Sequence, residues 1–276
     1  MSEKRYSIGC QSWGYDDWVT KADGPTVFYP RGTKQGEMLE QYARLIETVE
    51  VDSTAYGTPP ASTFEGWLEK VPEGFTFSLK VPRLITHEYS LDDRALPVFD
   101  EFCERSLILG KHLGLILIQL PASFESNKAN AQRLRTFIAR LPERQRFALE
   151  FREPGWFVNW TFEELNEAGV ALAMVEGPWV DRQIMFDSMA HLQTAHSYIR
   201  LMGERDLVKF DRVYRNRDEV IRQWAENLDR LRPDDVFVYT DNHFEGHAPG
   251  TANKLKRMLG LPEHEPAAIE TQSSLF

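Results

Sequence analysis

Short apolar segments of strand length alternate with more polar stretches along the whole chain. Eight of them are predicted to be strands: 6–13, 48–54, 75–81, 113–120, 146–152, 170–176, 197–203 and 235–242. Most of the intervening gaps carry apolar residues at helical spacing, as in 38–46, 96–107, 131–141 and 220–231. The gap between strands six and seven, 177–195, has no clean helical stripe and is expected to be irregular.

Eight strands joined by helical crossovers predict an α/β fold, a closed (β/α)8 barrel of the TIM type. We expect a single domain over residues 1–260. Thr161 and Glu164 have capping-box spacing and predict a helix start, and Gly169 predicts its end. The remaining segment, 261–276, is acidic and contains two prolines, so we expect a tail outside the barrel.

Several strands end in polar residues of one parity. In such a barrel the outward side chains lie under helices and stay apolar, so polar residues near a strand's carboxyl end should point into the open mouth, where barrel enzymes place their chemistry. The segment "FALEFREPGW" contributes Glu150 and Arg152. The other strands contribute Glu50, Asp52, Thr54, Ser78, Lys80, Gln119, Arg200, Asp241 and Asn242, and the flanking loops add the aromatics Trp13, Tyr15, Tyr56 and Trp156.

Buried ion pairs are the alternative reading of these charges. Glu50 or Glu150 could pair with Arg152 or Arg200 to fix the register of the barrel, because an unpaired buried charge is costly. For each residue alone, the two readings stay open. For the whole set a functional site is favoured, because many charges gathered at one end of a barrel are expensive to keep for packing alone.

The composition fits an ordinary globular protein and narrows its partners. The chain has 276 residues, 42% hydrophobic and 27% charged, with a net charge of -10, which disfavours broad nonspecific binding to nucleic acid. It has no apolar run of membrane-spanning length and no apolar core near its start, so we expect neither a membrane span nor a signal peptide. Cys10 and Cys103 are expected to be buried free thiols, and we expect a cytoplasmic protein.

Seven motifs, in order from about residue 6 to 260, resemble the YecE-like family of bacterial and archaeal proteins, the domain of unknown function numbered seventy-two. They are "IGCQSWGYDDW…FYP", "VEVDSTAYGTPP", "FSLKVPRLITH", "ILIQLP", "LEFREPGW", "YIRLMG" and "VYTDNHFEGHAPGTA". The resemblance implies a TIM-type barrel and no proven reaction. The motif positions carried over are Glu50, Thr54, Tyr56, Lys80, Thr86, His87, Gln119, Glu150, Arg152, Arg200 and Asn242.

The chain departs from the family pattern at several places. It has Ser12-Trp13-Gly14-Tyr15 where relatives typically read Gly-Trp-Ser-Tyr, and Ala55 replaces the usual aromatic residue. Asp52 stands where Asn is usual, and Asp241-Asn242 replaces paired asparagines. These changes add an acid at two mouth positions and put an identical activity in doubt.

An enzyme acting on a phosphorylated or otherwise anionic small substrate is the favoured hypothesis, with phosphoester or phosphodiester hydrolysis as its reaction. Lys80, Arg152 and Arg200 would hold the anion, Glu50 or Glu150 would act as general base, and His87 as acid or base near neutral pH. The substrate-binding set is completed by Trp13, Tyr15, Asp52, Tyr56, Gln119, Trp156 and Asn242.

Two further versions of an enzyme stay open. A divalent metal could be held by Glu50, Glu150 or Asp241 together with His87, since these are ligands that hard cations accept. A glycosidase would also use carboxylates and aromatics at a barrel mouth, but the three cationic mouth residues make it the weaker alternative.

A binding module is the hypothesis from a different class. The segment "QSSLF" resembles the short peptide, Gln, a variable pair and then Leu-Phe, by which bacterial repair and replication proteins dock on the sliding clamp. Gln272 would form hydrogen bonds, and Leu275 and Phe276 would fill an apolar pocket of the clamp. A tail that folds onto its own barrel is the alternative.

Overall fold

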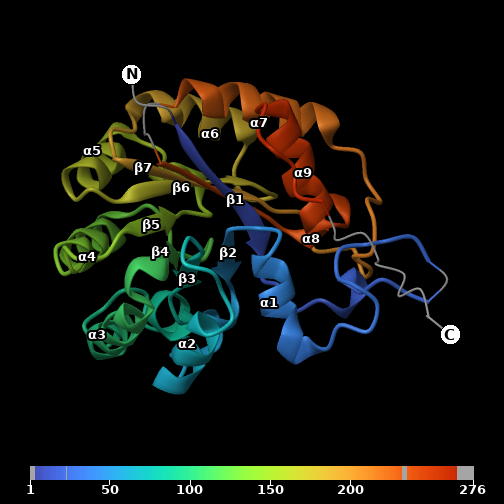
Figure 1. The fold of residues 1–276 in the computed structure, drawn as a ribbon. Coiled ribbons are helices and arrows are strands. Elements are labelled where there is room, and N and C mark those ends of the chain that lie inside the picture. Colours follow the sequence, from blue (N-terminus) through green and yellow to red (C-terminus); the bar gives the residue numbers. More distant parts are fainter. Residues whose placement is uncertain (1–3, 23, 232–234, 266–276) are drawn as a thin grey trace, which may run out of the picture.

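Eight parallel strands close into one barrel. The computed structural model describes residues 4–22, 24–231 and 235–265, and within them the strands follow one another in chain order, with β8 hydrogen-bonded to β1 (Figure 1). Their bounds are β1 Arg5–Gln11, β2 Thr48–Val51, β3 Thr76–Lys80, β4 Leu113–Gln119, β5 Phe147–Glu150, β6 Ala171–Glu176, β7 His196–Leu201 and β8 Asp235–Thr240. The predicted TIM-type barrel and its eight strands are confirmed.

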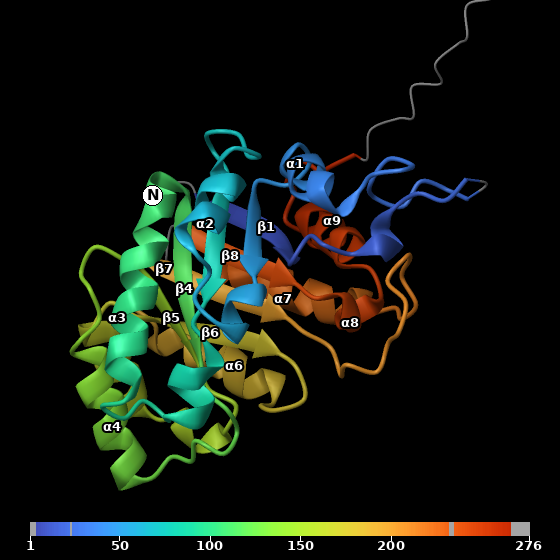
Figure 2. The ribbon, with the colours of Figure 1, turned by 90° about the horizontal axis from the view of Figure 1, so that it is seen from below.

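Helices surround the barrel on its outside (Figures 1 and 2). They are α1 Met38–Ala43, α2 Ala61–Leu68, α3 Ala95–Ser106, α4 Lys128–Ile138, α5 Asn159–Glu167, α6 Arg182–Ser188, α7 Asp218–Arg230, α8 Asn242–Glu245 and α9 Ala248–Met258. The gap between strands six and seven, expected to be irregular, holds the short α6 and a 3₁₀ turn, Met189–His191. Asp181 starts α6 by accepting a hydrogen bond from the amide of Gln183 at 2.7 Å.

Side chains along the strands alternate between two apolar clusters, as the parity of the sequence predicts. Residues facing the helices, such as Ile116 and Leu149, belong to the large outer core. Inward residues form a separate small cluster inside the barrel: Leu115, Leu117, Ala148, Ala171, Ala173, Tyr198, Phe237 and Tyr239. Side chains therefore fill the interior up to the level at which the inward residues become charged.

A layer of hydroxyl groups separates this apolar plug from the charged layer. The Tyr239 hydroxyl donates to Ser78 Oγ at 2.8 Å and lies 2.9 Å from Thr48 Oγ1. The Tyr198 hydroxyl lies closer to the charged layer and donates to a carboxylate oxygen of Glu50 at 2.6 Å. The polar groups inside the barrel thus bond to one another across strands that are distant in sequence, as buried polar groups must.

Two long segments lie side by side over the carboxyl ends of the strands. They are residues 12–22 and 24–37, between β1 and α1, and residues 202–217, between β7 and α7, and both views show them together (Figures 1 and 2). The amide of Phe210 donates to Asp17 at 3.0 Å, and the Phe210 ring packs edge-on against Tyr15 with ring centroids 5.7 Å apart. These contacts join the two segments at one side of the mouth.

The predicted capping box at the start of α5 is wrong. Helix α5 begins at Asn159, so Thr161 lies inside its first turn with a buried hydroxyl, and Glu164 pairs with Arg135 instead of completing a capping box. Gly169 follows the helix with φ 66°, as predicted.

The predicted tail, 261–276, begins as part of the folded body. His264 is buried edge-on against Phe28, and its backbone amide and carbonyl both bond to the Asn253 side chain at 2.9 and 2.8 Å. Residues 266–276, including Gln272, Leu275 and Phe276, lie outside the described residues.

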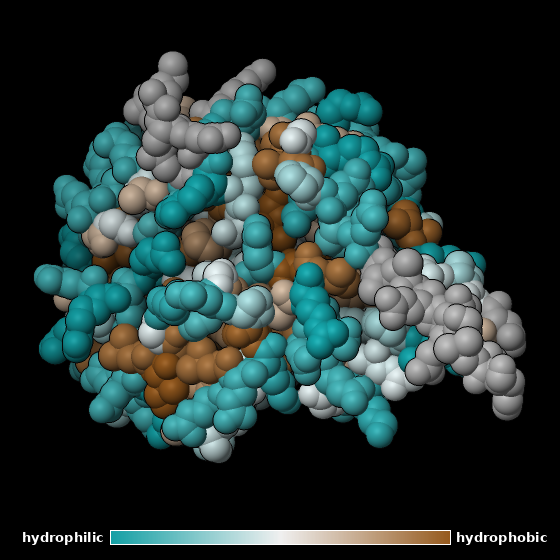
Figure 3. Space-filling view, viewed as in Figure 1, coloured by the Kyte–Doolittle hydropathy of each residue, from teal (hydrophilic) through white to brown (hydrophobic). Residues whose placement is uncertain are grey.

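One face of the molecule is largely hydrophilic, and the predicted burial of both thiols is confirmed. Hydrophilic residues cover most of the face seen in Figure 3, and hydrophobic residues show between them. Across the described part of the chain, no helix combines the length and the apolar character needed to cross a membrane. Cys10 and Cys103 are both buried and free.

Candidate functional site

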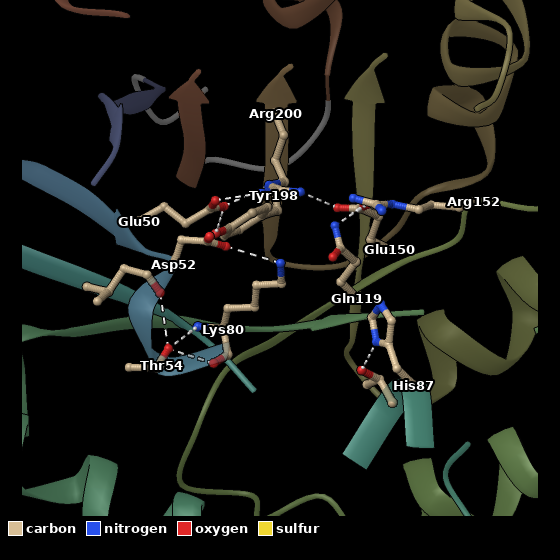
Figure 4. A network of polar contacts seen from close by, with 12 residues as sticks. Glu50, Asp52, Thr54, Lys80, His87, Gln119, Glu150, Arg152, Tyr198 and Arg200 are labelled. Carbon is tan, nitrogen blue, oxygen red and sulfur yellow. Dashed lines mark hydrogen bonds and ion pairs between the residues drawn. The ribbon is translucent and has the colours of Figure 1, made fainter. Parts of the chain in front are cut away.

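The floor of the barrel mouth is a three-residue ion-pair bridge. Arg200 of β7 lies between two carboxylates, Glu50 at the end of β2 and Glu150 at the end of β5 (Figure 4). Its Nε and Nη2 donate to the two oxygens of Glu50 at 2.8 and 2.7 Å, and its Nη1 donates to Glu150 at 2.6 Å. The Arg200 side chain is only 1% exposed, so the bridge is closed off from solvent.

Glu150 has donors on both of its oxygens. Besides Arg200, it accepts from Gln119 at 2.7 Å and from Arg152 at 2.9 Å. Burial alone would raise the pKa of Glu150, but Arg200, Arg152 and Lys80 outweigh burial and lower this pKa to about 2. Glu150 is therefore an anion whose oxygens already accept from three side chains, and this enclosure makes it a poor general base. The buried-ion-pair reading accounts for the geometry of Glu50, Glu150 and Arg200.

Lys80 and Asp52 form a second pair on the wall above the floor. Lys80 Nζ donates to Asp52 Oδ1 at 3.1 Å. Burial is the largest influence on each group: it lowers the pKa of Lys80 and would raise that of Asp52, whose pKa nevertheless falls because of Lys80. Thr54, in the 3₁₀ turn Ser53–Tyr56, accepts from the Lys80 amide at 3.1 Å and lies 2.6 Å from the Lys80 carbonyl oxygen. The turn after β2 thus fixes the end of β3.

The guanidinium group of Arg152 is held by a hydrogen bond at one edge and by an aromatic ring against one face. Its Nε bonds to Glu150, and its guanidinium carbon lies 3.6 Å from the centre of the Trp179 ring, a close cation–π contact. Its Nη2 is buried and has no hydrogen-bond partner among the described residues. A buried donor without a partner is costly, and a ligand oxygen would relieve that cost.

A cavity of about 120 Å³ lies above this frame. It is lined by Asp52, Ala55, Tyr56, Lys80, Arg83, His87, Gln119, Arg152 and Arg205. Four of these are cations and one is an acid, so the cavity is cationic although the whole chain is acidic. Tyr56 stands at its rim with 83% of its surface exposed.

His87 lines the cavity but differs from the acid or base expected near neutral pH. It lies in a π-helical turn, Leu84–Glu88, just after β3, and its Nδ1 is 2.8 Å from Thr86 Oγ1. Burial and the nearby cations Arg83, Lys80 and Arg152 lower its pKa to about 4. His87 is therefore neutral at pH 7, because burial and the nearby cations both disfavour its protonated form.

The structure places several predicted residues away from the cavity. Trp156 is buried and stacked between Phe124 and Phe151, and Trp13 packs edge-on against Trp67.

Asn242 and Asp241 fix the backbone where the chain leaves β8. Asn242 Oδ1 accepts from the Trp18 indole at 3.1 Å and from the Ala248 amide at 2.9 Å. Asp241 caps α8 by accepting from the amide of His243. Tyr15 packs on Trp18 and Phe210 in the segment after β1. All of these side chains shape the wall or the loops, whereas Asp52, Tyr56, Lys80, His87, Gln119 and Arg152 line the cavity as predicted.

Sequence reasoning missed two cations and one aromatic residue. Arg83 and Arg205 line the cavity from the loops after β3 and β7, and Trp179 supports Arg152 from the loop after β6. Arg83 and Arg205 line the cavity, whereas Arg200, which was predicted to hold an anion, does not. Each missed residue lies a few residues beyond the carboxyl end of a strand, and this position in the sequence is the signal that points to them.

The residues proposed for a metal do not fit one in this structure. Among the described residues, no group of three or more His, Cys, Asp or Glu side chains is arranged to hold a metal ion. The Arg200 guanidinium stands between Glu50 and Glu150, and Asp241 is engaged at the start of α8. A cation at this place would have to displace Arg200.

A larger cavity of about 590 Å³ lies at the opposite end of the barrel. It is lined by the ends of α4 and α5 and the starts of β5 and β6, including Ile138, Phe147 and Val170. We place the candidate site at the smaller cavity because barrel enzymes carry their chemistry at the carboxyl ends of the strands, and the larger cavity contains none of the predicted residues.

The backbone leaves β1 through a strained residue. Ser12 has φ 65°, in the left-handed region that favours glycine, and its amide donates to the Glu50 carbonyl at 2.8 Å. The family pattern described above has glycine at this position, which fits the left-handed conformation that Ser12 adopts.

Comparisons with known proteins agree with the fold. A family model described as "Protein of unknown function DUF72" matches residues 7–274. The chain is 27% identical to the UPF0759 protein YecE of Escherichia coli (strain K12), covering 98% of this chain and 99% of that protein, and 24% identical to the UPF0759 protein YunF of Bacillus subtilis (strain 168), covering 92% and 94%. Crystal structures of DUF72 family proteins from Enterococcus faecalis V583 and Thermotoga maritima MSB8 superpose with TM-scores of 0.74 and 0.72, at 20% and 23% identity. They cover 96% and 92% of this chain, and 98% and 99% of those chains.

Proposed function

The chain belongs to the DUF72 family of proteins of unknown function, and from this premise we propose that it is an enzyme that hydrolyses a small phosphorylated substrate. The observation that carries the proposal is the charge of the cavity. Lys80, Arg83, Arg152 and Arg205 line about 120 Å³ together with a single acid, Asp52. Guanidinium groups bind phosphate oxygens through paired hydrogen bonds, and the partnerless Nη2 of Arg152 supplies one such donor.

The size of the cavity limits what it takes in. A volume of about 120 Å³ suits one anionic group, well below the roughly 300 Å³ and more of a site that encloses a whole drug-sized ligand. The rest of the substrate would therefore lie at the rim, where the exposed ring of Tyr56 offers a face for stacking. The proposed substrate is a phosphomonoester whose phosphate enters the cavity.

Asp52 is the proposed general base in place of Glu50 and Glu150. Both glutamates are engaged by Arg200, whereas the Asp52 carboxylate lies on the cavity wall and has Lys80 as its partner. Asp52 accepts a proton from water as the water oxygen attacks phosphorus. The bond from phosphorus to the leaving oxygen then breaks, and the cations stabilise the charge on the phosphoryl oxygens.

His87 is the proposed acid for the leaving oxygen. A bound phosphate dianion offsets the charge of Arg83, Lys80 and Arg152, the cations that contribute to the low pKa of His87. Ligand binding therefore raises this pKa and allows His87 to carry a proton that it then donates. Hydrolysis would consume one water and yield an alcohol and inorganic phosphate.

Thermal unfolding with inorganic phosphate, followed by turnover of p-nitrophenyl phosphate and its bis-ester, tests this proposal. We expect phosphate to raise the unfolding midpoint of the full chain. Arg83→Gln and Arg205→Gln should reduce this effect, because both side chains are exposed and line the cavity. Arg44→Gln, at an exposed arginine paired with Glu40, is the matched control and should leave it unchanged. No midpoint shift with phosphate would overturn the proposal, and binding without turnover would overturn the hydrolysis.

Recruitment by the sliding clamp is the second candidate function, favoured by the sequence "QSSLF". Gln272, Leu275 and Phe276 match the pattern of clamp-docking peptides, and such a tail would bring the barrel to DNA without a basic surface. Binding of the full chain to a bacterial clamp, compared with Leu275→Ala/Phe276→Ala, tests it. Equal binding by both chains, or none by either, would contradict it. A glycosidase has less support, because Arg200 engages both Glu50 and Glu150.

A further inference from the structure

The amine of Lys80 stands on the cavity wall, in contact with a carboxylate and surrounded by arginines. We infer that Lys80 is a nucleophile that forms an imine with the carbonyl carbon of a small anionic carbonyl compound. This inference rests on the anion-binding part of the proposed function and adds a substrate class to it.

Lys80 is fixed at its backbone by two hydrogen bonds, and its amine contacts Asp52. Its amide and carbonyl both bond to Thr54, which holds the end of β3. The side chain is 7% exposed and extends toward the bridge made by Glu50, Arg200 and Glu150 (Figure 4). Among the described residues, its one ion-pair partner is Asp52, at 3.1 Å. A lysine held in this way presents one nitrogen to the cavity in a defined direction.

The surroundings favour the neutral form of this amine more than water does. Burial lowers the pKa of Lys80, and the charge of Arg200 lowers it further, while Asp52 and the two buried glutamates act in the opposite direction without restoring the ordinary value. A lysine beside other cations in a water-poor site is the kind that carries a free electron pair near neutral pH. Exposed lysines such as Lys34 and Lys70 lack this environment.

The pair with Asp52 supplies the proton transfers that imine formation needs. Asp52 takes a proton from the ammonium group, and the free electron pair of Nζ attacks the carbonyl carbon, forming the C–N bond. The carbonyl oxygen gains protons and leaves as water, the last proton being returned by Asp52. Lysine ammonium and carbonyl compound are thus converted to protonated imine and water, with no net change in protons or electrons.

The arginines select which carbonyl compounds reach Lys80. Arg83, Arg152 and Arg205 line the same cavity, so a carboxylate or phosphate near the carbonyl group would be held while the carbonyl faces the amine. A cavity of about 120 Å³ restricts the class to compounds of a few carbon atoms, or to the anionic carbonyl end of a larger one. Short 2-oxo acids belong to this class.

Reductive trapping on the wild-type full chain tests the inference. The chain is incubated at pH 7.5 with pyruvate and cyanoborohydride, which reduces an imine to a stable secondary amine, and the modified lysines are located by peptide mass spectrometry. We expect Lys80 to be modified about tenfold or more faster than Lys34 and Lys70, because its pKa is lowered and the anion is held beside it. Inorganic phosphate should suppress the modification of Lys80 and leave the exposed lysines unchanged.

Acetone, an uncharged carbonyl compound, is the control for the role of the arginines, and it should show a smaller preference for Lys80 than pyruvate does, because only the lowered pKa still acts. Equal preference with acetone and pyruvate would overturn the substrate class. Modification of Lys80 no faster than that of Lys34, while phosphate still raises the unfolding midpoint, would overturn the imine and leave the anion site standing. If phosphate neither raises the midpoint nor protects Lys80, the anion site on which both proposals rest is lost.

Discussion

Arg200 donates two hydrogen bonds to Glu50, at 2.8 and 2.7 Å, across 150 positions of the sequence. The pair is fully enclosed, and the third nitrogen of Arg200 continues the contact to Glu150. Two buried carboxylates therefore depend on one guanidinium, and removing that guanidinium would leave both without their main counter-charge.

Replacing Arg200 by methionine should lower the free energy of unfolding by roughly 3–5 kcal/mol, because breaking a buried ion pair leaves an uncompensated charge. Urea unfolding at pH 7.5 measures the change. Arg44→Met, which breaks an exposed pair with Glu40, is the matched control and should cost less than about 1 kcal/mol. Equal losses in the two variants would contradict a stabilising role for the bridge.

His264 should make the fold sensitive to mild acid. Burial, together with Lys256 and His247, lowers its pKa in the folded chain to about 3, against 6.5 for an ordinary histidine. The unfolded chain therefore takes up a proton first, so the stability associated with this residue is complete above pH 6.5 and falls as the pH drops toward 3.

The variant His264→Phe keeps a ring against Phe28 and removes the titrating group. Between pH 7.5 and pH 5 it should lose about 2 kcal/mol less stability than the wild-type chain, since each pH unit within the window contributes about 1.4 kcal/mol. Chemical denaturation at the two pH values measures this difference. Parallel losses in the two chains would show that His264 does not take part.

Ser12→Gly should stabilise the protein. Ser12 has φ 65°, and a residue with a Cβ atom is strained there by roughly 1–2 kcal/mol. Glycine removes the strain but adds freedom to the unfolded chain, so we expect a net gain of about 0.5–1 kcal/mol in thermal or urea unfolding. Ser62→Gly within α2 is the control, and it should destabilise the chain by a similar amount. A loss at position 12 would be evidence against the strain.

Gly203→Ala should disturb the mouth. A Cβ atom at this glycine would lie 1.9 Å from the carbonyl oxygen of His243, so the exits of β7 and β8 would have to separate. We expect a loss of at least 1–3 kcal/mol, as for an overpacked core. Gly66→Ala, in α2 with open space around it, should instead stabilise by about 0.5–1 kcal/mol. Comparing the unfolding free energies of the two variants tests the close approach of Gly203 to His243.

The barrel could be predicted from the sequence because its pattern is local and repeated. The alternation of Leu115 and Ile116 between interior and exterior follows from the two-residue period of a strand, and parity placed Lys80 and Gln119 at the mouth correctly. Parity gives the direction of a side chain. It does not show whether a charge meets a partner or open space, and Arg200 points inward yet ends under the cavity.

The loops limited the prediction of the site. Arg83 and Arg205 reach the cavity from segments outside the strand pattern, and no period marks them. The low pKa of His87 depends on Arg83, Lys80 and Arg152, which come together only in three dimensions. For the same reason the first residues of the expected tail pack on the barrel, since the contact of His264 with Phe28 joins opposite ends of the sequence.

The bridge through Arg200 also bears on the order of folding. Its three members come from β2, β5 and β7. The floor of the cavity therefore cannot form until β7 has been synthesised and the barrel is close to closed. A fragment that stops before β7 would contain Glu50 and Glu150 with no guanidinium between them. The ordered floor of this mouth is thus a late product of folding, and half-barrels of this protein should lack it.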